Sequence, residues 1–155
     1  MATLQVGDKA PLFTLLDQHG EQVRLSSFKG RPVVVYFYPK ADTPGCTTQS
    51  CALRDAEPDL AALDAVVIGI SPDVPAKLAK FDEKYALGFT LLSDEDHAVA
   101  EAWGAWGEKT LYGRKYMGII RSAFVVDAKG RLAGVFPKIS PKDTVPKTSK
   151  VLAAL

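Results

Sequence analysis

Several protein classes are excluded because the sequence lacks their features. Its 155 residues include only two cysteines, carry a formal net charge of +1 and contain no apolar run approaching the roughly 20 residues of a membrane-spanning helix. This charge balance gives no basis for binding nucleic acid or an anionic membrane. The first nine residues have no basic segment followed by an apolar one, so we expect no signal peptide and a cytoplasmic location.

The two cysteines do not fit the common metal and dithiol sites. A zinc site requires about four ligands, and Cys46 and Cys51 have no histidine near them in the sequence. We therefore expect no metal and no other cofactor. Their spacing also differs from the C-x-x-C pattern of dithiol oxidoreductases. In a reducing compartment such a pair is more typical of reactive thiols than of a structural disulfide. From the residues alone, a buried structural pair stays open.

Apolar and charged fractions of 47% and 24% are those of an ordinary soluble globular protein, and the length fits one domain spanning residues 1–155. Residues 33–37 and 66–71 have no polar alternation, which predicts strands buried on both faces of a sheet. The further expected strands are residues 13–17 and 22–25, which form an N-terminal hairpin, then 90–92, and finally 122–127 and 131–136, which form a second hairpin.

Helices are predicted between these strands from capping residues and apolar spacing. Thr43 and Pro44 suit the N-cap and first position of a helix that Pro58 is expected to break or restart. The other expected helices are residues 75–85, capped by Ser71 or Asp73, residues 97–103, capped by Ser93 or Asp94, and a C-terminal helix capped by Asp143. Residues 105–118 contain three glycines and no clear period, so we expect a loop. The order of elements predicts an α/β fold with a mixed sheet and helices on both faces.

The strongest functional signal is the segment that joins the buried strand 33–37 to the following helix. Cys46 lies in the first turn of that helix, where free backbone N–H groups and the positive end of the helix dipole favour a thiolate. Thr43, three residues earlier, can direct its hydroxyl to the same place. Pro39 restricts the loop, and Gly45 lets the backbone approach a small substrate closely.

The spacing of the two cysteines predicts a conformational change. On an intact helix, residues five apart have Cα atoms separated by roughly 8.6 Å and side chains on nearly opposite faces. A disulfide requires Cα atoms about 4.4–6.8 Å apart, so Cys46 and Cys51 can bond only if the helix unwinds. The four residues between them are mediocre helix formers, which keeps unwinding inexpensive. We therefore expect a reduced form with the helix formed and an oxidised form with it locally melted.

These residues resemble a known family. The pattern Pro39-x-x-x-Thr43-x-x-Cys46 is similar to the peroxidatic motif of peroxiredoxins. The longer match resembles the bacterioferritin-comigratory, or peroxiredoxin Q, subgroup and covers nearly the whole chain. It includes residues 7–15, 37–40, 43–48, Cys51, 53–55 and 121–127. The resemblance implies a thioredoxin-like fold.

The resemblance also implies a role for each site residue. Cys46 is then the peroxidatic nucleophile, which attacks the peroxide O–O bond and becomes a sulfenic acid. Thr43 hydrogen-bonds the thiolate and the peroxide, Arg121 stabilises the thiolate and the polarised oxygens, and Pro39 shields the sulfenic acid from water. Cys51 is the resolving cysteine, which forms an intramolecular disulfide that thioredoxin or a similar reductant reduces.

One position departs from the subgroup. The subgroup usually has a glutamate one helical turn after the nucleophile, where this chain has Gln49. The implied substrates are hydrogen peroxide and organic hydroperoxides, and resolution within one chain favours a monomer. An alternative function uses the same disulfide switch as a redox sensor or relay that passes oxidation to a partner. Rapid turnover favours the peroxidase, whereas slow stoichiometric oxidation favours the sensor.

Overall fold

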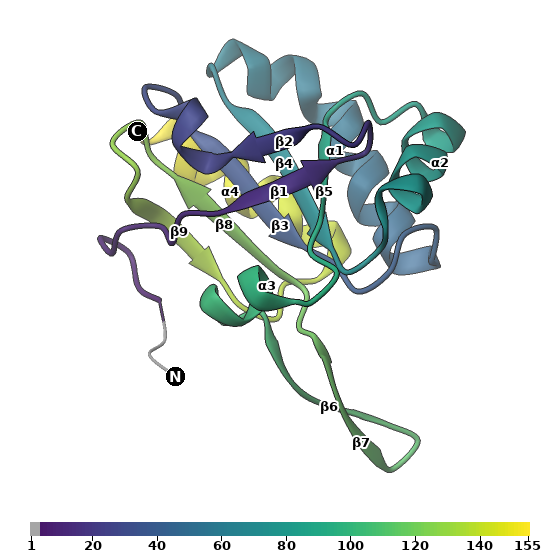
Figure 1. The fold of residues 1–155 in the computed structure, drawn as a ribbon. Helices are drawn as coiled ribbons and strands as arrows, with labels where there is room; N and C mark the ends of the chain where they lie inside the picture. The colour runs from purple at the N-terminus through teal and green to yellow at the C-terminus, as the bar shows by residue number, and fades with distance from the viewer. Residues whose placement is uncertain (1–3) are drawn as a thin grey trace.

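The computed structural model describes residues 4–155 and is built on a seven-stranded sheet in the order β2-β1-β5-β4-β3-β8-β9 (Figure 1). The first three residues, part of the stretch expected not to be a signal peptide, lie outside the described residues. The strands are β1 (Thr14–Asp17), β2 (Gln22–Arg24), β3 (Val33–Phe37), β4 (Val66–Ser71), β5 (Thr90–Ser93), β6 (Trp106–Leu111), β7 (Arg114–Ile119), β8 (Ser122–Val126) and β9 (Leu132–Phe136). The helices are α1 (Pro44–Ala62), α2 (Pro75–Tyr85), α3 (Ala98–Ala102) and α4 (Thr144–Ala153), with 3₁₀ turns η1 (Leu25–Phe28) and η2 (Pro141–Asp143).

Strand β3 lies in the interior of the sheet, as its uninterrupted apolar run predicts. All five of its residues are buried, and it pairs in parallel with β4 and antiparallel with β8. Alternate side chains enter two different cores: Val34 and Tyr36 face one side, and Val33, Val35 and Phe37 face the other. A β-branched apolar run therefore contributes to both cores at once.

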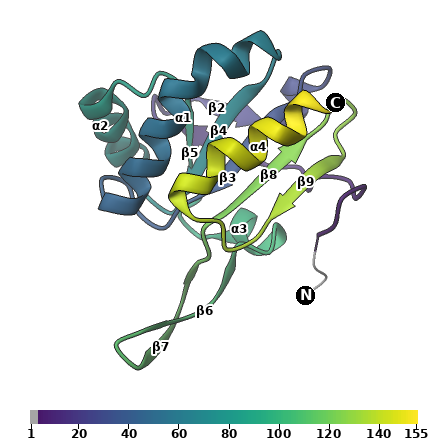
Figure 2. The same cartoon turned by 180° about the vertical axis from the view of Figure 1, so that it is seen from behind.

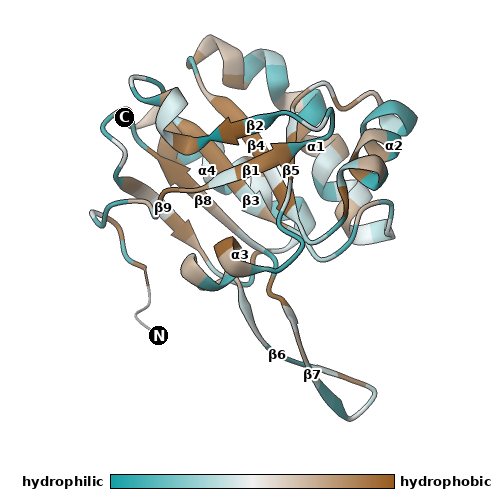
Figure 3. Cartoon of the chain, in the orientation of Figure 1, coloured by the Kyte–Doolittle hydropathy of each residue, from teal (hydrophilic) through white to brown (hydrophobic). Residues whose placement is uncertain are grey.

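Helices cover both faces, so the predicted mixed sheet is confirmed, as is the N-terminal β1–β2 hairpin. The first core lies under α1, α2 and α4, which cross the sheet together in Figure 2. The second core is covered by α3, η1 and the segment before β1, with Trp103 at its centre. The strands between these layers carry the most apolar residues (Figure 3). No helix in residues 4–155 has the length and apolarity to cross a membrane.

Helix α1 continues through Pro58, so the predicted break is wrong. A proline inside a helix removes the hydrogen bond to the carbonyl four residues earlier, here that of Arg54. Glu57, Pro58 and Asp59 are all exposed, so the missing bond lies on the outer face of the helix. The buried face of the same part of α1, which includes Leu60, keeps the helix packed on the sheet.

The predicted loop at residues 105–118 is also wrong, because the segment is the β6–β7 hairpin. The hairpin projects away from the body of the protein (Figure 1), and its strands are largely exposed. Without a buried face it shows no apolar alternation. Its tip, Tyr112–Gly113, has positive φ at both residues, as a tight two-residue hairpin turn requires.

The predicted helix positions are correct, but some of the expected caps are not. The residue before α2 is Val74, which makes no side-chain cap, whereas Ser71 and Asp73 bond each other. The predicted helix 97–103 is shorter, and its N-cap residue is His97. Asp94 nevertheless accepts hydrogen bonds from two amides in the first turn of α3, those of Val99 and Ala100. Burial of this carboxyl raises the pKa of Asp94.

Candidate active site

Helix α1 starts seven residues after β3 ends and places Cys46 in its first turn. Pro44 occupies the first helical position, which its fixed φ and missing N–H suit. The following amides of Gly45 and Cys46 belong to the first turn, which has no earlier turn of carbonyls to bond. Cys46 itself is fully buried and reduced. The positive end of a 19-residue helix therefore lies beside its sulfur.

Arg121 is brought to Cys46 by the pairing of β8 with β3. The register pairs Ser122 with Phe37, so the residue before β8 lies beside the segment that follows β3. The Nη2 atom of Arg121 donates to the Cys46 Sγ atom at 3.2 Å. A guanidinium cannot lose its proton at physiological pH, so it presents a fixed positive charge to the sulfur.

Gly45 allows this close approach. A Cβ atom at position 45 would lie 3.2 Å from the Arg121 Nη2 atom and 3.7 Å from the Pro141 Cγ atom. The first distance is shorter than ordinary van der Waals contact, so a larger residue would displace the guanidinium. The absence of a side chain at Gly45 therefore leaves room for the Arg121 guanidinium beside Cys46.

Gln49, the departure from the subgroup, lies in the same site. It is fully buried on α1, one turn after Cys46. Its Oε1 atom accepts from Arg121 Nη1 at 2.7 Å, and its Nε2 atom donates to the Oγ1 atom of Thr144 at 2.9 Å. Thr144, the first residue of α4, was not among the residues selected from the sequence, and no local pattern distinguishes it.

The loop before Cys46 is tied to α2 and to the segment between β4 and α2. Thr43 is the N-cap residue of α1, but its hydroxyl donates to the carbonyl of Lys40 at 2.8 Å and makes no cap. The Asp73 carboxylate accepts from the amide of Ala41 at 2.7 Å. Lys84 and then Tyr85 hydrogen-bond the Asp42 carboxylate and lower its pKa. Pro39, partly buried, begins this restrained loop.

Cys51 lies on the same unbroken helix and is partly buried. Because α1 is continuous from Pro44, the roughly 8.6 Å expected between the Cα atoms of residues five apart applies, and both thiols are free. Between the cysteines, the Oγ atom of Ser50 is 2.8 Å from the Tyr36 hydroxyl. Both residues are fully buried, and burial raises the pKa of Tyr36 well above its ordinary value. A buried hydrogen bond therefore anchors to β3 the segment that must move.

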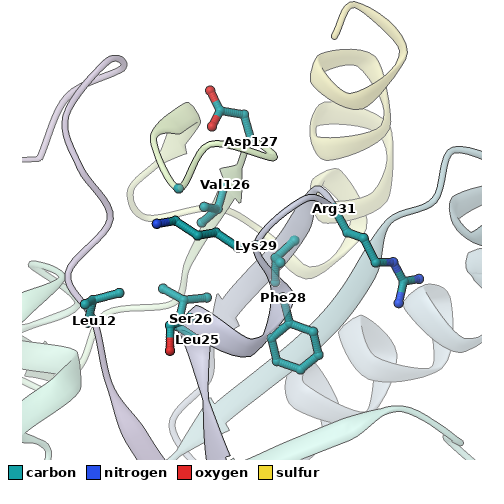
Figure 4. A pocket seen from close by; sticks show the side chains of 10 residues that line it. Leu12, Leu25, Ser26, Phe28, Lys29, Arg31, Val126 and Asp127 are labelled. Atoms are coloured by element: carbon teal, nitrogen blue, oxygen red, sulfur yellow. The ribbon is translucent and has the colours of Figure 1, made fainter.

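A cleft of about 420 Å³ opens beside the first turn of α1. Its walls are Pro44, Gly45 and Thr48 on one side and Ser140, Pro141 and Lys142 on the other. A second, smaller cavity of about 90 Å³, shown in Figure 4, lies at the opposite end of β3, beside Val33 and Val126. No group of three or more histidine, cysteine or acidic side chains within residues 4–155 is arranged to hold a metal ion.

Comparisons of the sequence with protein families and with individual proteins find matches over most of the chain. Residues 6–135 match the AhpC/TSA family. The "Putative peroxiredoxin bcp" of Haemophilus influenzae is 56% identical over 143 residues, which is 92% of each chain.

Two solved structures are similar to this chain over nearly its whole length. The crystal structure of peroxidoxin BcpB from Mycobacterium tuberculosis superposes with a TM-score of 0.88 at 36% identity and covers 98% of both chains. A Xanthomonas campestris bacterioferritin comigratory protein, whose structures concern its alkyl peroxide reduction activity, gives a TM-score of 0.84 at 30% identity, over 99% of this chain and 96% of that one.

Proposed function

The chain belongs to the AhpC/TSA family, among the peroxiredoxins of the Bcp group, and from that premise we propose a catalytic cycle in which Cys46 reduces a hydroperoxide and Cys51 resolves the product. The observation that carries the proposal is the 3.2 Å contact of Arg121 with the Cys46 sulfur in the first turn of α1. A thiol in that position has both a fixed cation and a helix N-terminus to favour its reactive, deprotonated form.

In the first step, the Cys46 thiolate attacks the terminal oxygen of the hydroperoxide. A sulfur–oxygen bond forms, the O–O bond breaks, and the leaving alkoxide or hydroxide takes a proton and departs as an alcohol or water. Cys46 becomes a sulfenic acid. Arg121, which donates to the sulfur and carries a delocalised charge, stabilises the oxygens on which negative charge develops.

We assign substrate entry to the cleft beside Gly45 and Pro141. Cys46 is fully buried, so the hydroperoxide must enter past the first turn of α1, and this cleft lies beside that turn. Its volume of about 420 Å³ accommodates an organic substituent as well as hydrogen peroxide. By analogy with the alkyl peroxide reduction activity of the Xanthomonas relative, organic hydroperoxides are included among the substrates.

In the second step, the first turns of α1 unwind and the Cys51 thiolate attacks the sulfur of the sulfenic acid. A disulfide forms as the sulfur–oxygen bond of the sulfenic acid breaks, and the hydroxide that leaves takes a proton to become water. A dithiol reductant of the thioredoxin type then reduces the disulfide through a mixed disulfide. Resolution within one chain requires no partner subunit, which favours a monomer. We also propose that residues 1–155 act as one domain and that the protein works in the cytoplasm.

Peroxide consumption tests this cycle, with thioredoxin and its reductase supplying electrons. Wild type, Cys46→Ser and Cys51→Ser are compared under steady state. The cycle predicts no activity for Cys46→Ser, and for Cys51→Ser a single turnover followed by poor recycling. Normal turnover by Cys46→Ser contradicts the assignment. Slow, stoichiometric oxidation of the wild type in excess reductant supports the redox sensor instead.

A further inference from the structure

We propose that Thr144 is a positioning residue of the thiol site and acts through Gln49 on Arg121. The proposal rests on the proposed role of Cys46 as the reactive thiol. It concerns a threonine on the last helix, nearly a hundred residues from that cysteine in the sequence.

A continuous series of hydrogen bonds connects the two. The Thr144 hydroxyl accepts from Gln49 Nε2 at 2.9 Å, and Gln49 Oε1 accepts from Arg121 Nη1 at 2.7 Å. The Nη2 atom of the same guanidinium donates to the Cys46 sulfur at 3.2 Å. Gln49 and Thr144 are fully buried, so water cannot take the place of a lost hydrogen-bond partner at either residue.

The direction of each bond is fixed by chemistry. A guanidinium has only donors, so Gln49 must present its carbonyl oxygen to Arg121. The amide NH₂ of Gln49 is then directed away from Arg121, and a buried donor without an acceptor is costly. Thr144 supplies the acceptor, because its own proton is donated to the carbonyl of Ser140 at 3.0 Å. No other rotation of the glutamine amide satisfies these groups together.

The neutral glutamine also leaves the charge of Arg121 directed at sulfur. Among residues 4–155, no carboxylate lies within 4.0 Å of its guanidinium, since the ion pairs there involve other cations. A glutamate at position 49 would place a full negative charge against Arg121 and would need Thr144 to donate to it, at the expense of the bond to Ser140. Gln49 with Thr144 thus orients the arginine without neutralising it.

The next turn of α4 provides a matched control. Thr148 is also a fully buried threonine, one helical turn after Thr144. Its hydroxyl donates to the backbone carbonyls of Thr144, at 2.6 Å, and Val145, at 3.4 Å, and within the described chain it hydrogen-bonds no side chain of the site. Thr144→Val and Thr148→Val each replace a buried hydroxyl by a methyl group of similar size, and only the first removes an acceptor from Gln49.

The test measures the rate of alkylation of Cys46 by iodoacetamide from pH 5 to pH 9, with the folded protein in a Cys51→Ser background. We expect Thr144→Val to slow alkylation at neutral pH by about twofold to tenfold, the effect of losing one buried hydrogen bond between neutral groups, and to move the midpoint of the profile to higher pH. Thr144→Ser, which keeps the hydroxyl, should restore the rate to within about twofold, and Thr148→Val should leave it unchanged.

Gln49→Leu provides the second arm. In the Gln49→Leu variant the hydrogen-bonded connection between Thr144 and Arg121 is already broken, so adding Thr144→Val should not change the alkylation rate further. An unchanged rate in Thr144→Val, no rescue by serine, or an equal loss in Thr148→Val each overturn the proposal. If Thr144→Val does not fold, as judged by circular dichroism, Thr144→Ala takes its place with the same expectations. Alkylation does not require peroxide, so a failure of the proposed peroxidase function is seen separately, as wild type that does not consume peroxide.

Discussion

The buried hydrogen bond between Tyr36 and Ser50 is expected to slow the formation of the disulfide. Ser50 lies between the two cysteines, in the segment of α1 that must unwind, whereas Tyr36 lies on the interior strand β3. The bond therefore exists only while the helix is folded. A buried hydrogen bond of this kind contributes about 0.5–1.5 kcal/mol, so Tyr36→Phe should speed disulfide formation by about twofold to tenfold.

The assay isolates that step. Reduced protein is mixed with excess hydrogen peroxide and quenched with an alkylating agent, and the rate constant that does not depend on peroxide concentration is measured. Ser50→Ala should give the same acceleration as Tyr36→Phe, and the double variant should give no more. Tyr38→Phe is the control, because the ring of Tyr38 stacks on Tyr36 but its hydroxyl makes no hydrogen bond to α1 within the described chain. An unchanged or slower step in Tyr36→Phe refutes the view that this bond restrains the unwinding segment.

Three further substitutions test other parts of the account. Gly45→Ala should slow the first peroxide reaction severalfold in stopped-flow assays, because its Cβ would lie 3.2 Å from the site's guanidinium and displace it. Gly69→Ala places a Cβ 2.7 Å from the Tyr36 ring and should lower the free energy of unfolding in urea by about 1–3 kcal/mol. The pKa of Asp42 is lowered by Lys84, so the stability from this pair is present above its ordinary value of 3.8 and lost as pH falls below it. The gap in thermal midpoint between wild type and Lys84→Gln should therefore close on acidification; a constant gap down to low pH contradicts the pairing.

The central strands and the start of α1 could be predicted because their signals are local. Residues 33–37 and 66–71 are apolar throughout, and the structure buries them between two layers. Pro44 after Thr43 correctly marks the first turn that holds Cys46. These features depend on side-chain chemistry over a few residues, which the sequence states directly.

The errors come from segments whose conformation is decided by solvent exposure. Pro58 is tolerated because its missing hydrogen bond lies on the exposed face of α1. The β6–β7 hairpin has little buried surface, so neither the two-residue period of a strand nor the 3.6-residue period of a helix distinguishes it from a loop. Its one local signal is the Tyr112–Gly113 pair, which adopts the positive φ values of a tight turn.

The site shows the same division. Cys46 and Thr43 lie in one short segment and are recognisable from their spacing, whereas Arg121 was identified only through family resemblance. The β3–β8 register brings it to the thiol, and no nearby residue predicts that pairing. Thr144 joins the site through the packing of α4 beside α1, a contact between elements nearly a hundred residues apart.

The central claim, that Cys46 is oxidised and Cys51 resolves it, is tested most directly by mass spectrometry after one equivalent of peroxide. The reduced wild type should lose two hydrogens, and peptide mapping should place one disulfide between Cys46 and Cys51. In Cys51→Ser the same treatment should add one oxygen to Cys46, trapped as a sulfenic acid adduct by dimedone. A wild type that keeps both thiols free, or an oxygen added at Cys51 while Cys46 stays reduced, would contradict the account.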